Sequence, residues 1–266
     1  MEMVNLAALV CSENHCFDLS RRGYVNFLNH SLKTKYDKSL FESRRMIWES
    51  GFFEQLHKET AQKMKNELTH KNKQINILDA GCGEGSFLSE INKEFIDHPT
   101  IDLLGIGMDI TKEGINIAAR DYSDSIWCVA DIVNCPFKEK QFHFILNILS
   151  PSNYGEFKRL LADDGIIIKV IPERYYLKEL RDVFHEYTNK KVYSNQKTVD
   201  HFKKHFKIID VSRIQYERTL NKNLLISLIQ MTPLSWKVPE GKIQQFFDRN
   251  VQTITVDLTI LVGIPY

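Results

Sequence analysis

The segment Ile77–Phe87 constrains the fold of this chain more than any other part of the sequence. An apolar run ends in Asp79, and three glycines then follow at alternate positions, Gly81, Gly83 and Gly85. Such a segment is typical of a parallel strand that passes into a helix through a tight turn, because glycine accepts backbone angles that other residues avoid. A turn without side chains also exposes backbone N–H groups at the helix N-terminus, where a nucleotide-like ligand can bind.

The spacing of these glycines indicates which cofactor the turn fits. The dinucleotide fingerprint is G-x-G-x-x-G, whereas this chain has Asp-x-Gly-x-Gly-x-Gly, with Asp79 two residues before Gly81. A carboxylate at this place repels a pyrophosphate, but it tolerates the ammonium group of S-adenosylmethionine, which carries no phosphate. The turn therefore predicts an S-adenosylmethionine site at Asp79, Gly81 and Gly83. A turn that is tight only for packing is the alternative.

The remainder of the chain predicts an α/β fold. After residue 72, strand-like segments alternate with helical ones, and strands joined by helical crossovers form a parallel, doubly wound sheet. Two late strand-like segments lack this alternation and predict an antiparallel pair at the sheet edge, the usual ending of a class I methyltransferase sheet. We therefore expect a Rossmann-like, mostly parallel seven-stranded sheet. Its strands are expected over residues 75–80, 101–110, 126–130, 142–149, 165–171, 206–216 and 251–263, with helices over 84–95, 112–120, 154–161, 175–187 and 224–230.

The N-terminal part of the chain shows weaker patterns. Apolar residues recur at helical spacing from Ser39 to about Lys71, and Gly51 divides this stretch into two helices. Residues 1 to about 45 are otherwise irregular. We divide the chain into a small N-terminal module over residues 1–38 and a methyltransferase domain over residues 39–266.

Acidic residues follow the ends of two predicted strands. Ligands of doubly wound sheets bind beyond these ends. Asp109, with its neighbour Ile110, ends the second strand, where a carboxylate can accept hydrogen bonds from the ribose hydroxyls. Asp131 follows the third strand, where it can accept a hydrogen bond from the adenine amino group. A helix N-cap for Asp109 and a turn residue for Asp131 are the alternatives.

The fourth predicted strand ends where the transferable methyl group would lie. It reaches Asn147 and continues into Ser150 and Pro151, and Pro151 fixes the backbone after the strand. Asn147 and Ser150 offer neutral polar groups that can orient a substrate base. No residue of this segment is acidic, so the sequence identifies no general base for the reaction. A plain strand–helix turn is the alternative.

The composition excludes several classes of protein. The net charge of +1 creates no basic field over the whole molecule, so any nucleic-acid contact needs a local patch. No apolar run approaches the roughly 18 residues of a membrane span, and the first ten residues are too short and too weakly basic for a secretory signal. Five cysteines, an odd number without the spacing of a disulfide framework, indicate a reduced cytoplasm.

A local basic patch lies between Ser20 and Arg45. Basic residues outnumber acidic ones there, and interleaved aromatic residues can stack on unpaired bases. The patch predicts a clamp on an RNA hairpin loop, and a solvated basic surface is the alternative. The predicted RNA contacts are Arg21, Arg22, Tyr24, Lys33, Lys35, Arg44 and Arg45.

Several blocks of the chain resemble the guanine-N1 methyltransferases of large-subunit ribosomal RNA, a family with housekeeping members and members that confer macrolide resistance. The resemblance implies transfer of a methyl group from S-adenosylmethionine to N1 of a guanine in a hairpin loop, by a cytoplasmic enzyme that forms a homodimer. A small-molecule methyltransferase and a cofactor-binding protein without activity are the alternatives. The blocks are Cys11-Ser-Glu-Asn-His15, Gly23-Tyr24-Val25-Asn26, Ser43-Arg44-Arg45, Leu149-Ser150-Pro151 and Gln230-Met231-Thr232-Pro233-Leu234-Ser235-Trp236.

The resemblance also implies roles for single residues. Phe53 matches an aromatic residue that contacts the cofactor in this family, and Tyr176 matches a second cofactor contact, where the family often has histidine. The N-terminal module of the family binds zinc through two pairs of ligands, and Cys11 and His15 match the second pair. The first pair is missing, and two ligands cannot complete a tetrahedral site. We therefore expect residues 1–38 to be a remnant of this module, with an incomplete zinc site.

Overall fold

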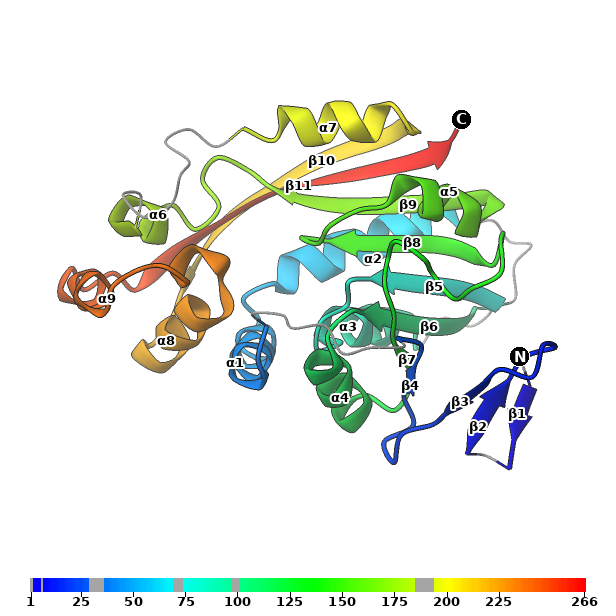
Figure 1. The fold of residues 1–266 in the computed structure, drawn as a ribbon. Coiled ribbons are helices and arrows are strands. Elements are labelled where there is room, and N and C mark those ends of the chain that lie inside the picture. Colours follow the sequence, from blue (N-terminus) through cyan, green and yellow to red (C-terminus); the bar gives the residue numbers. More distant parts are fainter. Residues whose placement is uncertain (1, 6, 29–35, 69–73, 97–100, 185–193) are drawn as a thin grey trace.

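The computed structural model describes residues 2–5, 7–28, 36–68, 74–96, 101–184 and 194–266. An eight-stranded sheet forms its centre, in the order β10-β11-β9-β8-β5-β6-β7-β4 (Figure 1). All pairs from β4 to β9 in this order are parallel, and β11 runs antiparallel to both β9 and β10. The strands are β4 (Val25–Asn26), β5 (Gln74–Ala80), β6 (Asp102–Asp109), β7 (Ile126–Val129), β8 (Phe142–Ile148), β9 (Leu161–Pro172), β10 (Phe206–Thr219) and β11 (Thr253–Pro265).

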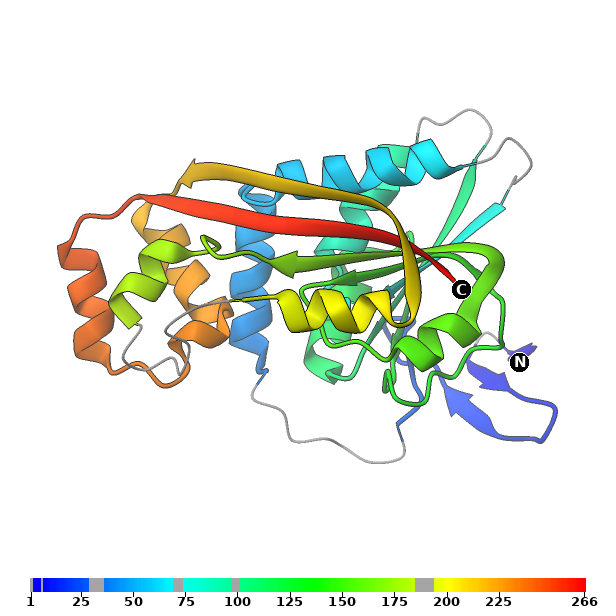
Figure 2. The same ribbon diagram turned by 90° about the horizontal axis from the view of Figure 1, so that it is seen from above.

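Helices cover both faces of the sheet (Figure 2). One face carries α1 (Lys38–Glu49), α2 (Glu54–Glu67), α3 (Ser86–Phe95) and α4 (Lys112–Asp121). The opposite face carries α5 (Tyr154–Leu160) and α7 (Gln196–Lys203). The remaining helices lie beyond the carboxyl ends of the parallel strands (Figure 1): α6 (Lys178–Phe184), α8 (Lys222–Met231), the short 3-10 helix η2 (Pro233–Ser235) and α9 (Glu240–Asp248).

The predicted class I methyltransferase fold is confirmed, with one additional strand. The alternation of strands and helices and the antiparallel pair at one edge follow the prediction. The sheet has eight strands instead of seven because β4 pairs with β7, Val25 beside Cys128 and Asn26 beside Val129. A strand of two residues is too short to produce a period-2 pattern, so it could not be predicted from the sequence.

The prediction that the N-terminal residues are irregular was wrong. The strands β1 (Glu2–Val4), β2 (Ala8–Val10) and β3 (Cys16–Asp18) form a separate antiparallel sheet. Phe17 of β3 packs edge-on against Phe27, with 4.9 Å between the ring centroids. Both rings lie against the core on the α5 side of the large sheet. Whether the boundary between module and domain falls at residue 38 stays a prediction.

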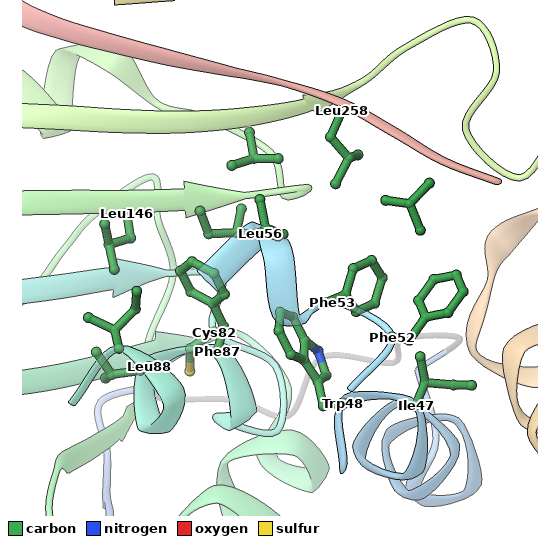
Figure 3. Packing of buried hydrophobic residues seen from close by; sticks show 14 of the residues in the cluster. Ile47, Trp48, Phe52, Phe53, Leu56, Cys82, Phe87, Leu88, Leu146 and Leu258 are labelled. Atoms are coloured by element: carbon green, nitrogen blue, oxygen red, sulfur yellow. The ribbon is translucent and has the colours of Figure 1, made fainter. Parts of the chain in front are cut away.

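The core on the α3 side joins the two N-terminal helices to the glycine turn. Trp48 of α1 lies 4.7 Å from Phe53 and 5.6 Å from Phe87 of α3, measured between ring centroids. Figure 3 shows these rings between the sheet and the helices, with Cys82 of the turn beside them. Burial of these large rings fixes α1 and α2 against α3. In the described part of the chain, no helix is both long enough and apolar enough to cross a membrane.

Candidate active site

The register of the sheet brings the carboxyl ends of four strands to one edge. Ala80 of β5 pairs with Met108 of β6, and Asn147 of β8 pairs with Lys169 of β9. A cavity of about 220 Å³ opens at this edge. Its walls come from β6, from the segments after β5, β7 and β8, and from α1. The lining residues are Tyr36, Phe41, Arg44, Gly81, Met108, Asp109, Ile110, Thr111, Ala130, Ile132, Leu149, Ser150 and Pro151.

The glycine turn is tight at this cavity because neighbouring segments approach its backbone. Gly81 has a φ of +85°, and a Cβ atom there would lie 2.7 Å from Cβ of Ser150. Gly83 has a φ of +59°, and its N–H donates to Oδ2 of Asp109 over 2.9 Å. Both positions combine a left-handed backbone with close contacts, which only glycine accommodates without strain. The turn therefore allows the neighbouring segments to pack closely and also forms one wall of the cavity.

Asp79 is buried at the start of this turn, and its carboxylate is unsatisfied. The residue is 1% exposed, and neither carboxylate oxygen has a hydrogen-bond partner within the described residues. Burial raises the pKa of Asp79 to about 7, and the nearby carboxylates of Asp109 and Glu84 act in the same direction, while Arg44 opposes them. A buried carboxylate without a partner is costly. The ammonium group of S-adenosylmethionine is a ligand that would satisfy it.

Arg44 connects the helix α1 with the turn. Its Nε lies 3.1 Å from Oε2 of Glu84, whose side chain is almost fully buried. Burial raises the pKa of Glu84, and the positive charge of Arg44 opposes this shift. Arg44 was predicted as an RNA contact, but the structure places it in the wall of the cavity. Glu84 was not among the predicted site residues, because its only sign in the sequence was its position inside the glycine turn.

The two predicted partners of the nucleoside lie at the same edge in different environments. Oδ2 of Asp109 accepts from Gly83, and Oδ1 accepts from N–H and Oγ1 of Thr111 at 2.8 and 2.6 Å. A carboxylate offers about four lone-pair positions, so little room remains for two ribose hydroxyls. Asp131 is not part of the cavity lining; its Oδ1 accepts from N–H of Val133 at 2.9 Å.

A second cavity of about 360 Å³ adjoins the first. The two share Tyr36, Arg44, Leu149 and Ser150 in their walls, so a ligand in one lies next to a ligand in the other. Both aromatic residues implied by the family resemblance lie in the second cavity. Its lining residues are Tyr36, Leu40, Arg44, Trp48, Phe53, Ile148, Leu149, Ser150, Lys169, Val170, Ile171, Pro172, Tyr176, Thr198, Met231, Thr232 and Pro233. Burial raises the pKa of Tyr176 to about 12, so its hydroxyl stays protonated near neutral pH.

Asn147 stabilises the end of β8 through hydrogen bonds and lines neither cavity. It is 0% exposed, and its Nδ2 donates to the carbonyls of Ala80 and Pro151 and to Oγ of Ser150. Ser150 does line both cavities, and its Oγ donates to the carbonyl of Ala80 over 2.8 Å. Asn147 therefore holds the turn that carries Ser150 and would act on a substrate only through it.

Lys169 was missed by the sequence analysis. It is 4% exposed, lines the second cavity, and donates from Nζ to Oδ1 of Asn147 at 2.5 Å and to Oγ of Ser152 at 2.7 Å. Burial lowers its pKa to about 8. The sign in the sequence was one lysine inside the apolar run Ile166–Ile171, a strand that the pattern predicted to be buried on both faces.

The predicted RNA patch is only partly available for contact. Tyr24 is 6% exposed and packs in the core, which leaves no open ring for stacking. Arg45 pairs with three carboxylates, those of Glu42, Glu49 and Asp121. Two further members of the patch are exposed: Arg21, and Arg22, which donates to the carbonyl of Asn116. The predicted contacts Lys33 and Lys35 lie outside the described residues.

A different basic surface lies beside the second cavity, on α7 and α5. We call this the α7 surface and define it as Lys158, Lys197, His201, Lys204 and His205. Positions 197, 201 and 204 share one side of α7 with Asp200, whose Oδ1 accepts from Nε2 of Gln196 at 2.7 Å. Thr198 on the same helix lines the cavity. Within the described ranges, none of the five forms an ion pair. Burial and the neighbouring charges of His201, Lys158 and Lys204 lower the pKa of His205.

The zinc ligands implied by the resemblance form a pair and no more. Sγ of Cys11 lies 3.3 Å from Nδ1 of His15. No cluster of three or more His, Cys, Asp or Glu side chains that could hold a metal ion occurs in the described part of the chain. A structural zinc ion needs four ligands, so these residues do not fit one.

The comparisons with known proteins agree with this geometry. A family model described as a methyltransferase domain matches residues 71–246. A Bacillus subtilis (strain 168) protein named "Putative 23S rRNA (guanine-N(1)-)-methyltransferase YxjB" is 40% identical over 265 residues, which cover 99% of this chain and 93% of the relative. The "23S rRNA (guanine(748)-N(1))-methyltransferase" of Streptomyces fradiae is 26% identical over 230 residues, covering 86% of this chain and 80% of that protein.

A solved structure supports the fold independently of these names. The crystal structure of the YcgJ protein from Bacillus subtilis matches with a TM-score of 0.53 and 14% sequence identity, covering 78% of this chain and 98% of that chain. At this identity the likeness shows the fold alone.

Proposed function

We infer the function of this chain from its family: it belongs to the 23S rRNA guanine-N1 methyltransferases and has the S-adenosylmethionine-dependent methyltransferase fold. The proposed activity is transfer of a methyl group from S-adenosylmethionine to N1 of a guanine in a hairpin loop of large-subunit ribosomal RNA. One observation carries the proposal. Two adjoining cavities share Arg44 and Ser150 at the carboxyl edge of the sheet, one suited to a cofactor and the other to a base.

The cofactor would lie in the first cavity, against the glycine turn. S-adenosylmethionine supplies a methyl group on a positively charged sulfur. The unsatisfied carboxylate of Asp79 is the proposed partner of its ammonium group, and the guanidinium of Arg44 is the proposed partner of its carboxylate. Asp109 would bind one ribose hydroxyl. Ala130, Ile132 and Ile110 offer apolar walls for the adenine ring, with Asp131 reaching its amino group only after a local shift.

The target guanine would enter the second cavity. The resemblance implied cofactor contacts for Phe53 and Tyr176, but both line this cavity and not the first, so we propose that their aromatic faces contact the base. Ser150 lies between this cavity and the first. A base in a hairpin loop is unpaired and can leave the stack at small cost. Held in line with the methyl group, its N1 would be positioned for attack on the methyl carbon once it has lost its proton. Asn147 contributes by fixing the turn that carries Ser150.

The α7 surface supports an RNA substrate over a small molecule. It places unpaired positive charge next to the cavity that would receive the base, where the phosphates of a hairpin loop would pass. Arg21 and Arg22 remain further proposed contacts. A ribosomal RNA substrate also places the proposed activity in the cytoplasm. The homodimer remains a proposal from the family resemblance, and zinc is left out because Cys11 and His15 supply only two ligands.

A methylation assay tests this function. The chain is incubated with methyl-labelled S-adenosylmethionine and large-subunit ribosomal RNA that lacks the modification, and reverse transcription locates the product, since an N1-methyl group blocks base pairing. We expect incorporation at one guanine and a stop at that position. Cofactor binding by calorimetry, without incorporation into this RNA, would overturn the proposal and favour a small-molecule substrate. The variant Asp79→Ala, expected not to bind the cofactor, provides the blank.

A further inference from the structure

We propose that the side-chain amine of Lys169 accepts the proton that guanine N1 loses during methyl transfer. This inference rests on the proposed function and extends it, because guanine N1 carries a proton at neutral pH and cannot attack while it holds it. The described residues of the second cavity include no carboxylate that could take this proton. Lys169 is the one lysine in that lining.

The geometry places Lys169 at the end of the sheet where transfer would occur. It pairs in register with Asn147 of β8, three residues before Pro172 ends β9 at the cavity. Nζ donates to Oδ1 of Asn147 at 2.5 Å, to Oγ of Ser152 at 2.7 Å and to the carbonyl of Ser150 at 3.3 Å. Ser150 lines both cavities, so the amine directly contacts a residue of the wall that they share.

The three acceptors around Nζ match the ammonium form of the side chain. An ammonium group has three N–H donors, and each of these acceptors takes one. All three are neutral, and no carboxylate contacts Nζ within the described residues. A buried lysine without a counter-ion is easily deprotonated. The neutral amine has one N–H fewer, so it must give up one of these bonds to free its lone pair. The bond to the carbonyl of Ser150 is the longest at 3.3 Å, and Ser150 lies in the wall that the two cavities share, so the lone pair of the neutral amine would face that wall and the regained proton would restore this bond.

The remaining charged and titratable groups of the cavity do not compensate this charge. Tyr36, Arg44 and Tyr176 line it together with Lys169, and none of them is a carboxylate. Arg44 is positive, and Tyr176 stays neutral because burial raises its pKa to about 12. Burial alone lowers the pKa of Lys169 to about 8, so roughly a tenth of the molecules carry the neutral amine at pH 7. This fraction is sufficient for general base catalysis.

In the proposed step, guanine N1 loses a proton to Lys169 and gains the methyl group. The N1–H bond of guanine breaks, its electron pair stays on the ring, and the proton passes to Nζ of Lys169. N1 forms a bond to the methyl carbon, and the carbon–sulfur bond breaks with its electron pair remaining on sulfur. The products are N1-methylguanine, a neutral thioether and an ammonium group held by Asn147, Ser150 and Ser152. The ammonium group returns its proton to water after product release.

Single-turnover methylation between pH 6 and 10 tests the inference. The wild-type rate is expected to rise with pH and level off above about 8. Lys169→Met and Lys169→Gln should each lower the rate at pH 7.5 by about 10²–10³-fold, and their remaining activity should rise only at the higher pH where guanine N1 itself ionises. Cofactor affinity, measured by calorimetry, should stay within about threefold and would show that both variants fold. Lys63→Met is the matched control, because Lys63 is also buried but pairs with Asp210 away from both cavities.

Lys169→Arg separates proton acceptance from a purely electrostatic role. Arginine keeps the positive charge but cannot lose its proton in proteins, so this variant should be as slow as Lys169→Gln. A rate within threefold of wild type for Lys169→Arg, or for the Met and Gln variants, would overturn the inference. Wild-type protein that binds the cofactor but methylates no RNA would instead overturn the proposed function.

Discussion

Asp79 and Lys169 are both buried at the carboxyl edge of the sheet, and neither contacts a partner of opposite charge within the described ranges. Burying an uncompensated charge costs stability. Residues of this kind persist where their charge serves a ligand or a reaction. Replacing either residue with a neutral one should therefore raise stability and impair function, which makes both residues suitable for mutation.

Asp79→Asn should stabilise the free protein at pH 8 and abolish cofactor binding. Burial raises the pKa of Asp79 to about 7 in the folded chain, above the ordinary value of 3.8 for an aspartate. The folded state therefore favours the protonated form, and it loses stability as the pH rises from about 4 to about 7. Asparagine cannot ionise, so the variant should gain roughly 2–4 kcal/mol at pH 8. The gain should vanish below pH 4.

Urea unfolding at pH 8 and pH 4, with calorimetry for the cofactor, measures both effects. Asp163→Asn is the control, because Asp163 is exposed and pairs only with exposed Lys140, so its replacement should change stability by no more than about 0.5 kcal/mol. A less stable Asp79→Asn protein at pH 8 would contradict the assignment of Asp79 as an uncompensated charge.

Gly81→Ala should damage the cofactor site and the fold together. The new Cβ would lie 2.7 Å from Ser150, and the residue would keep a φ of +85°. We expect a loss of about 1–3 kcal/mol in unfolding free energy and at least tenfold weaker cofactor binding. Gly241→Ala is the matched control: nothing lies within 4 Å of its Cβ position in α9, and alanine favours a helix, so stability should hold or rise. Equal effects of the two changes would contradict this view of the turn.

At the scale of elements, the repeated pattern of strands and helices could be predicted from the sequence. Very short strands, and side-chain contacts between distant elements, could not. The strands from β5 to β9 were predictable because each apolar run is followed by a helix. The strands β1 to β4 have only two or three residues and carry no measurable period. Arg44 was placed with the RNA contacts because a helical pattern gives no information on which distant turn its side chain reaches. Lys169 was missed because one polar residue does not interrupt a buried strand.

The α7 surface yields a prediction about RNA affinity. Lys197→Glu combined with Lys204→Glu reverses two charges beside the second cavity and should raise the KM for RNA at least tenfold at low salt, because fewer phosphates are neutralised. Cofactor affinity should not change. Lys93→Glu combined with Lys138→Glu applies the same change in net charge on α3 and in the segment between β7 and β8, and should leave the KM within about twofold. An equal loss in both double variants would indicate a general charge effect rather than docking on α7.

At the scale of the whole molecule, the cofactor site and the N-terminal sheet are separate parts of one structure. The lining of both cavities begins at Tyr36 and contains no residue of β1 to β4. The N-terminal sheet contacts the core on the α5 side instead, through Leu9 and Phe17. Cofactor binding and N-terminal contacts should therefore respond independently to mutation.

Deletion of residues 1–18 removes β1, β2 and β3 and tests this independence. Cofactor affinity should stay within about twofold, because no lining residue is lost. Stability should fall by a few kcal/mol, because the deletion uncovers apolar surface where Phe17 packs on Phe27. The KM for RNA should rise, because Arg21 and Arg22 lose the sheet that positions them, while the rate at saturating RNA should change little. Calorimetry, thermal unfolding and methylation kinetics measure these three effects. Loss of cofactor binding in a folded deletion variant would show that the N-terminal sheet supports the catalytic edge directly.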